Sequence, residues 1–222
     1  MNKTDHISVD NLAKLEQKVS SAFYYCGNIT PDYQCGDLAR GALKKLLCQQ
    51  NLIQEKGPLT FSDFTEVLEV PHYWVTLSHT RPRLKEMALN FASAGLANKK
   101  KWGGIGVDVE WALRPMLDGA KKYFVNQLDQ NFKSFGSWNK ITPPPLLLLW
   151  SKKEAAFKAL RQTQRQFREQ TNRELLLKDI WINGDFFGLC QSPQIAKGTV
   201  SSVEAFFYQS FIMSVAHLYL DE

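Results

Sequence analysis

The chain has 222 residues, of which 44% are hydrophobic and 12% aromatic, so it can bury the core of one large or two small domains. This composition excludes an intrinsically disordered tail, and the longest apolar run, residues 146–150, is far shorter than the roughly 20 residues of a membrane span. Residues 1–10 are polar and lack the apolar block of a secretory signal, so we expect a cytoplasmic protein without membrane association. The net charge of +5 favours anionic partners.

The cysteines show neither a CxxC pair nor a histidine at zinc-finger spacing. We therefore expect reduced thiols and neither a zinc site nor a disulfide framework. The cysteines are Cys26, Cys35, Cys48 and Cys190.

Apolar residues recur at helical spacing from Leu12 to Phe23 and from Leu38 to Leu47, which predicts two amphipathic helices. Alternating patterns predict strands over Tyr73–His79 and Ile105–Glu110, and the small apolar run Met87–Leu96 predicts another strand between them. The first half of the chain is thus predicted to change from helices to strands.

Two further helices are predicted in the second half. The first runs from Met116 to Phe132 and is opened by Arg114 and Pro115, since proline is tolerated in a first turn. The second runs from about Leu146 to Gln164, after a triple proline that cannot continue a helix.

Two hairpins are predicted to follow. Asn183-Gly184 is a strong turn signal between strands at 179–182 and 185–189, and residues 203–208 and 211–217 flank a second turn. The whole order predicts an α+β architecture of two similar halves, residues 1–102 and 103–222, each a small sheet with helices against it. A short similarity between residues 74–79 and 212–217 suggests a weak internal duplication.

Two acids stand two positions apart on the strand predicted over residues 105–110. Asp108 and Glu110 therefore project from one face, and their mutual repulsion and desolvation favour a cation or a basic partner. Taken alone, such a pair is more commonly an exposed strand edge or part of a salt bridge.

The helix predicted after the prolines carries W-S-K-K-E-A-A-F-K from Trp150 to Lys158. Trp150, Glu154 and Lys158 are spaced by four and share one helix face. Taken alone, this pattern is an ordinary pair of opposite charges beside a core tryptophan.

The two segments together resemble the paired signature of the 4′-phosphopantetheinyl transferases. That signature reads G-[VI]-D-x-E, a gap of forty-odd residues, then [FW]-[SCT]-x-K-E-[AS]-x-x-K. Every position is filled here, from Gly106 to Glu110 and from Trp150 to Lys158, with 46 positions from Asp108 to Glu154.

Three upstream fragments extend the resemblance, and with the chain length they match the larger, single-chain, pseudo-symmetric class of the family. Thr76-Leu77-Ser78-His79 resembles the S-[LIV]-S-H segment, with threonine at its first position. D-L-A-R, ending at Arg40, resembles the D-x-x-R helix, and K-G-P from Lys56 stands where the family often has G-K-P.

The resemblance implies a pseudo-twofold fold and transfer of 4′-phosphopantetheine from coenzyme A to a serine of an apo acyl or peptidyl carrier protein, with release of 3′,5′-ADP. It implies that Mg²⁺ is held by three carboxylates, those of Asp108, Glu110 and Glu154. It also implies that Glu154, or a metal-bound water that it orients, takes the serine proton and that Lys158 contacts the phosphate. By the same resemblance Arg40, Lys56, Ser78 and His79 contact coenzyme A phosphates, with Arg40 on the 3′-phosphate.

Small acidic carrier domains would suit the basic charge, and we expect a monomer that binds neither nucleic acid nor membrane. Three alternatives remain open. They are a non-catalytic relative that binds coenzyme A or a carrier protein, a nucleic-acid binder, and another metal-dependent phosphoryl enzyme using the same carboxylates.

Overall fold

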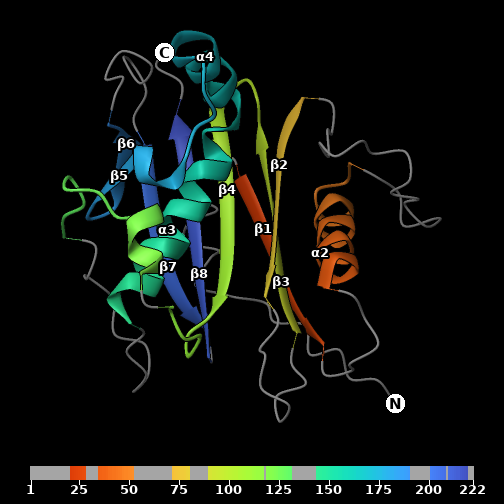
Figure 1. Ribbon diagram of the computed structural model, residues 1–222. Helices are drawn as coiled ribbons and strands as arrows, with labels where there is room; N and C mark the ends of the chain where they lie inside the picture. The colour runs from red at the N-terminus through yellow and green to blue at the C-terminus, as the bar shows by residue number, and fades with distance from the viewer. Residues whose placement is uncertain are drawn as a thin grey trace. The chain divides into compact units, whose positions relative to one another are not determined.

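The computed structural model describes residues 21–28, 35–52, 72–80, 90–117, 119–131, 144–190, 201–208 and 210–219. The chain divides into two compact units, Met1–Lys99 and Lys100–Glu222. Each unit contains an antiparallel sheet and at least one helix (Figure 1), so the predicted α+β class is confirmed. None of the helices described in these segments is both long and apolar enough to cross a membrane.

The first unit packs one amphipathic helix on a three-stranded sheet. Its elements are β1 (Ser21–Asn28), α2 (Cys35–Gln49), β2 (Tyr73–Thr80) and β3 (Asn90–Asn98). The sheet order is β1-β3-β2, and both pairings are antiparallel. The core of the unit contains buried alanine and leucine side chains from α2 together with side chains from β2 and β3, namely Ala42, Leu43, Leu46, Leu47, Val75, Ala94 and Leu96.

These elements confirm the predicted helix at Leu38–Leu47 and the predicted strand at Tyr73–His79. The predicted strand at Met87–Leu96 is confirmed from Asn90 onward, and its first three residues lie outside the described part. The helix predicted from Leu12 to Phe23 is wrong at its end, because Phe23 lies on β1; residues 12–20 lie outside the described part. Aromatic residues such as those at 23–25 favour a strand, and pairing with β3 satisfies the backbone there.

The second unit has a three-stranded sheet and a separate hairpin. The sheet contains β4 (Trp102–Trp111), β7 (Ser201–Tyr208) and β8 (Phe211–Tyr219) in the antiparallel order β4-β8-β7. The hairpin pairs β5 (Ile180–Asn183) with β6 (Phe186–Leu189) around Gly184, which has φ = 60°. The predicted strands in this half are thereby confirmed.

The helical elements of this unit lie between β4 and β7 in the chain. They are η2 (Ala120–Tyr123), α3 (Pro145–Ala159), α4 (Arg161–Thr171) and η3 (Leu177–Asp179). Figure 1 shows α3 lying along the sheet formed by β4, β8 and β7.

Both sheets have the same connectivity. In each unit a first strand is followed by a helix, then by a second and a third strand, and the third strand pairs between the other two. The suggested equivalence of residues 74–79 and 212–217 is wrong, because β2 is a second strand at a sheet edge whereas β8 is a third strand at a sheet centre. By position in the sheet, β2 corresponds to β7.

The helix predicted from Met116 to Phe132 is wrong. Only the single turn η2 is helical there, after Gly119 at φ = 78°, and Phe132 lies outside the described part. Beyond this turn, a side chain accepts a hydrogen bond that a helix would give to a backbone carbonyl: the backbone amide of Asn126 donates to Asp129 Oδ2 at 2.8 Å. Local bonds of this kind compete with the helical ladder.

The helix predicted after the prolines begins as expected, with Pro145 in its first turn. It ends at Ala159 and, after Leu160, a second helix runs to Thr171, so the prediction of one helix to Gln164 is wrong. Leu160 has ψ = 9° instead of a helical value, which interrupts the helix at this one residue, while Leu160 and Phe167 both stay buried in one core cluster.

Glycines allow α3 to lie unusually close to β4. A Cβ at Gly106 would lie 1.8 Å from the carbonyl oxygen of Ala155, and one at Gly104 would lie 1.9 Å from that of Ala159. The obstructing atoms belong to a helix backbone, which cannot relieve the clash by a change of rotamer as a side chain can. The glycine of the sequence signature thus has a packing role.

We expect Gly106→Ala to destabilise the protein by about 1–3 kcal/mol, since the added methyl group must push α3 away from β4. Gly41→Ala is the matched control because Gly41 lies exposed on α2 with nothing within 4 Å of an added Cβ, and it should be neutral or slightly stabilising. Urea denaturation of both variants measures the difference. A Gly106→Ala protein as stable as wild type would contradict the close packing.

A buried histidine on β8 gives the second unit a defined pH response. The ring of His217 packs at a tilt against that of Trp102, with 5.0 Å between the ring centroids, and burial lowers the pKa of His217 from 6.5 to about 4. Below about pH 6.5 His217 therefore binds a proton in the unfolded chain, whereas in the folded chain it stays neutral down to about pH 4. Stability contributed by neutral His217 is lost as the pH falls from about 6.5 to 4, by about 3 kcal/mol.

We expect His217→Phe, which keeps an aromatic ring, to flatten the pH dependence of the unfolding free energy between pH 7 and 4. His72→Asn is the control, since His72 is exposed and asparagine tolerates its φ of 67°. Unfolding is measured in urea at half-unit pH steps. An unchanged slope in His217→Phe would mean that other groups cause the acid sensitivity.

Candidate functional site

The two acids of β4 lie on the strand face that α3 covers. Side chains alternate along a strand, so Asp108 and Glu110 share a face with Gly104 and Gly106, which contact the backbone of α3. Both acids are buried, with 5% and 6% of their surface exposed. They are therefore not an exposed strand edge.

Each acid has a basic neighbour. Lys158 Nζ, on α3, donates to Asp108 Oδ1 at 3.2 Å and to the carbonyl oxygen of Val107 at 2.9 Å. Arg114 Nη1 donates to Glu110 Oε1 at 2.5 Å, and the indole Nε1 of Trp150 donates to the same oxygen at 3.1 Å. Residues from the two halves of the sequence signature are thus in direct contact.

Glu154 belongs to the same electrostatic cluster. Burial, and next the negative charge of Asp108, raise the pKa of Glu154 above 4.5, although Lys158 and Arg114 oppose the shift. Burial and Asp108 also raise the pKa of Glu110, against the hydrogen bonds from Arg114 and Trp150. Burial is the largest cause of both shifts, so these carboxylates are costly to ionise in the folded chain, and additional positive charge would stabilise their ionised forms.

Buried polar contacts fix the same helix to the sheet and to the hairpin. Ser151 Oγ lies 2.8 Å from Ser214 Oγ on β8, and Lys152 Nζ donates to Gly184 O at 2.8 Å and Asp185 Oδ1 at 3.0 Å. These contacts set the position of α3, and so of Glu154 and Lys158.

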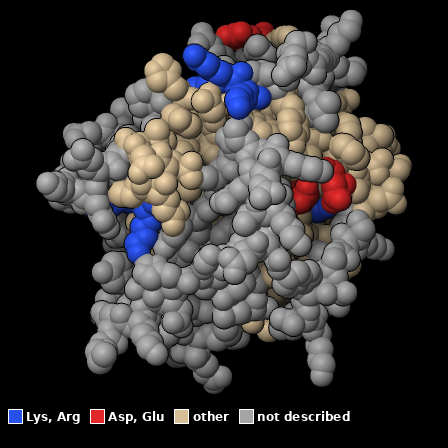
Figure 2. All heavy atoms as spheres, turned by 180° about the vertical axis from the view of Figure 1, so that it is seen from behind, with Lys and Arg blue, Asp and Glu red and all other residues tan. Residues whose placement is uncertain are grey.

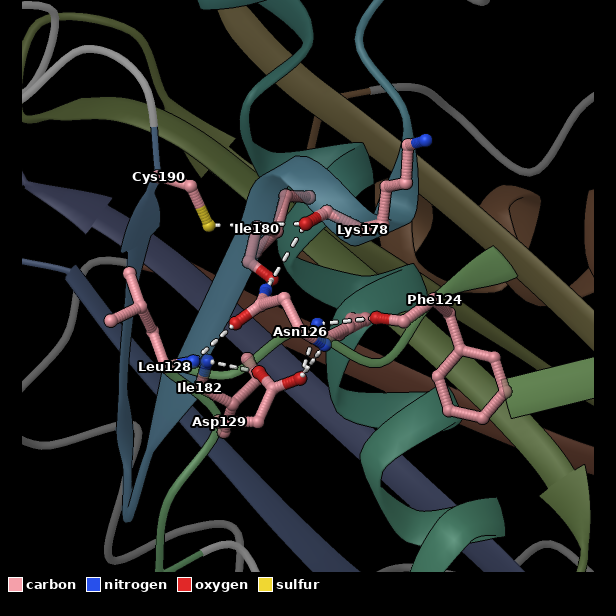
Figure 3. A network of polar contacts seen from close by, with 9 residues as sticks. Phe124, Asn126, Leu128, Asp129, Lys178, Ile180, Ile182 and Cys190 are labelled. Carbon is pink, nitrogen blue, oxygen red and sulfur yellow. Dashed lines mark hydrogen bonds and ion pairs between the residues drawn. The ribbon is translucent and has the colours of Figure 1, made fainter. Parts of the chain in front are cut away.

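A buried ion pair also anchors α3. Lys153 Nζ lies 2.8 Å from Asp129 Oδ2, and the two side chains are 0% and 1% exposed. Asp129 also accepts hydrogen bonds from the backbone amides of Asn126 and Ile182, as Figure 3 shows. Lys153 Nζ donates to the carbonyl oxygen of Phe124. Burial lowers the pKa of Lys153, and the hydrogen bond to Asp129 opposes that shift.

The carboxylates fit a hard divalent cation in their chemistry. All three supply oxygen, the donor that Mg²⁺ prefers, and none requires a histidine or cysteine beside it. In the part of the chain that the structure describes, no three His, Cys, Asp or Glu side chains already stand together as metal ligands. Instead, Arg114 and Lys158 supply the positive charge at Glu110 and Asp108.

The other residues assigned by the resemblance belong to the first unit. Arg40 is exposed on α2, Ser78 is buried and His79 is exposed, as expected for neighbours on opposite faces of β2. Lys56 lies outside the described residues. The contacts described for the cluster of Asp108, Glu110, Glu154 and Lys158 all come from the second unit.

Sequence reasoning missed two residues. The sequence pattern predicts Arg114 at the start of a helix, but Arg114 lies in the turn after β4 and pairs with Glu110. Lys153 matches the lysine that precedes the glutamate in the second half of the signature. In the structure it is fully buried in an ion pair. An arginine four positions after an acid was the only available signal for the first, and the sequence held no signal for the second. No protein-family model matches the chain, and no curated protein matches it.

Proposed function

We propose that this protein is a Mg²⁺-dependent 4′-phosphopantetheinyl transferase of the cytoplasm, which modifies a serine of an apo acyl or peptidyl carrier protein with coenzyme A as donor. The proposal rests on one observation above others: Lys158 Nζ contacts Asp108 Oδ1 at 3.2 Å, although the two residues are fifty positions apart. Two segments that matched short patterns only by chance would not be expected to lie side by side in the folded chain. Here both patterns contribute side chains to one cluster.

Glu154 is suited to accept a proton. A carboxylate with a raised pKa is a stronger base than an ordinary one, and an effective general base has a pKa close to the working pH. Glu154 would accept the proton of the attacking serine hydroxyl directly or through a water that it orients.

Lys158 is suited to bind a phosphate. Its side chain is 28% exposed, and its ammonium lies beside the acid cluster, where it can neutralise charge that develops on the transferred phosphate. Asp108, Glu110 and Glu154 would hold Mg²⁺, which when bound supplies neutralisation of the pyrophosphate oxygens. In the same proposal Arg40, Lys56, Ser78 and His79 bind coenzyme A phosphates, and a guanidinium such as that of Arg40 can bind two phosphate oxygens at once.

The shared connectivity of the two sheets supports the finer part of the proposal, a fold of two pseudo-symmetric halves acting as a monomer. A duplicated half would produce such a repeat of strand, helix, strand and strand. Among the described residues, the β5–β6 hairpin and the acid cluster belong to the second unit, as additions to the shared pattern.

Charge supports an acidic protein partner. The chain has a net charge of +5, and Figure 2 shows described lysine and arginine side chains that reach the surface in small groups. Opposite charge raises the rate of encounter with small acidic carrier domains.

The decisive experiment is the intact mass of an apo carrier protein after incubation with this protein, coenzyme A and Mg²⁺. We expect a gain of one phosphopantetheine, absent with EDTA or with Glu154→Gln. Acyl, polyketide and peptidyl carriers are each tried.

One alternative predicts a different result. A non-catalytic relative would bind coenzyme A or the carrier, detectable by calorimetry, with no mass gain for any carrier. That result would replace the proposed transferase by a binding protein.

A further inference from the structure

Arg114 is the more exposed of the two basic residues in the acid cluster. It follows β4 in a turn closed by its own amide, which donates to the carbonyl of Trp111 at 2.9 Å. Its side chain is 46% exposed, whereas that of its partner Glu110 is 8% exposed. When the ion pair opens, Arg114 moves into water and Glu110 remains.

Lys158 is held more firmly than Arg114. Its side chain is 28% exposed and has a second partner in the carbonyl of Val107. A cation that approaches the carboxylates therefore displaces Arg114 at a lower cost than Lys158. Solvated arginine regains its hydrogen bonds from water, so the exchange costs little.

We propose that Arg114 is an internal counterion of the acid cluster, which competes with a divalent cation for Glu110 and is released when the cation binds. Two positive charges on one carboxylate oxygen repel each other, and Arg114 already donates to Glu110 Oε1 at 2.5 Å. Arg114 lowers the net negative charge of the metal-free cluster and thereby reduces its metal affinity. The inference rests on the metal site of the proposed function.

The test is binding of Mn²⁺ alone, a probe that takes the same oxygen ligands as Mg²⁺. Calorimetry and the rise of the thermal midpoint with Mn²⁺ concentration both report affinity without any activity assay. The variants are Arg114→Gln, Arg114→Lys and Glu154→Gln. Arg168→Gln is the matched control, since Arg168 forms an exposed ion pair with Glu174 in the same unit.

We expect Arg114→Gln to bind Mn²⁺ about twofold to fivefold more tightly than wild type, the range expected for loss of one partly exposed ion pair. Arg114→Lys should lie between the two, and Arg168→Gln should match wild type.

Suppose that wild type binds Mn²⁺, that Glu154→Gln does not, and that Arg114→Gln binds as tightly as wild type or less tightly. This result would overturn the competition but leave the metal site intact. Arg114 would then be a residue that orients Glu110. Absence of binding by both wild type and Arg114→Gln would overturn the metal site itself, and the inference with it.

Discussion

Glu154→Gln is expected to abolish transfer and to make the protein more stable. Loss of a general base costs roughly 10²- to 10⁴-fold in rate, and loss of a metal ligand adds to that. The stability gain has a separate cause: burial and the charge of Asp108 raise the pKa of Glu154, so its ionised form is unfavourable in the folded chain. A neutral amide removes that cost, for a gain of about 0.5–2 kcal/mol at pH 7.

The sign of the pH effect follows from the same shift. Because the folded chain holds the Glu154 proton more tightly than the unfolded chain, wild type loses stability as the pH rises from about 4.5 through the raised pKa. The advantage of Glu154→Gln should therefore vanish below pH 4.5. Urea denaturation in EDTA across this range measures it.

Glu174→Gln is the control for both readouts, since Glu174 is exposed and pairs with Arg168 at the surface. It should change neither transfer nor stability. A Glu154→Gln protein that is less stable than wild type at pH 7 would show that Glu154 supports the fold, and an active one would remove it from the proposed chemistry.

Lys153→Met is expected to cause a loss of about 3–5 kcal/mol in unfolding free energy. The methionine fills similar space, but Asp129 keeps a buried charge whose ammonium partner is gone, and breaking a buried pair in this way is costly. The backbone amides of Asn126 and Ile182 remain on Asp129 and compensate only in part.

Two further variants separate charge from packing. Lys121→Met, at an exposed lysine of η2, should stay within about 0.5 kcal/mol of wild type. Adding Asp129→Asn to Lys153→Met should recover part of the loss, because the uncompensated charge is then removed. No recovery in the double variant, measured by urea denaturation, would show that the loss comes from packing.

The predictions that were confirmed rest on local periodicity. The helix α2 and the strands β2, β4 and β8 each bury one or both of their faces, so their apolar residues recur at regular spacing. Such spacing can be recognised in the sequence without knowing which elements pack against it. Asn183-Gly184 likewise specifies a tight turn by its own chemistry, and the structure has Gly184 at positive φ.

The predictions that failed depended on distant partners. Residues 116–132 have helical spacing, but Asn126 and Asp129 bond to their own loop and to β5, which outweighs a weak propensity. The break at Leu160 was missed because Leu160 and Phe167 keep helical spacing on one buried face, so periodicity does not report the interruption. The supposed repeat of residues 74–79 in residues 212–217 failed because sheet position, which a short match does not report, differs between β2 and β8.

By itself the sequence determined the spacing of Asp108 from Glu110 and of Glu154 from Lys158, and periodicity alone puts each pair on one face of its element. Only the tertiary structure decided that these faces meet, because the absence of Cβ atoms at Gly104 and Gly106 lets α3 approach β4 closely. The tertiary structure also decided the partners of Lys153 and Arg114. A loop places Asp129 beside Lys153, and the turn after β4 places Arg114 beside Glu110. Neither contact produces a periodic pattern in the sequence.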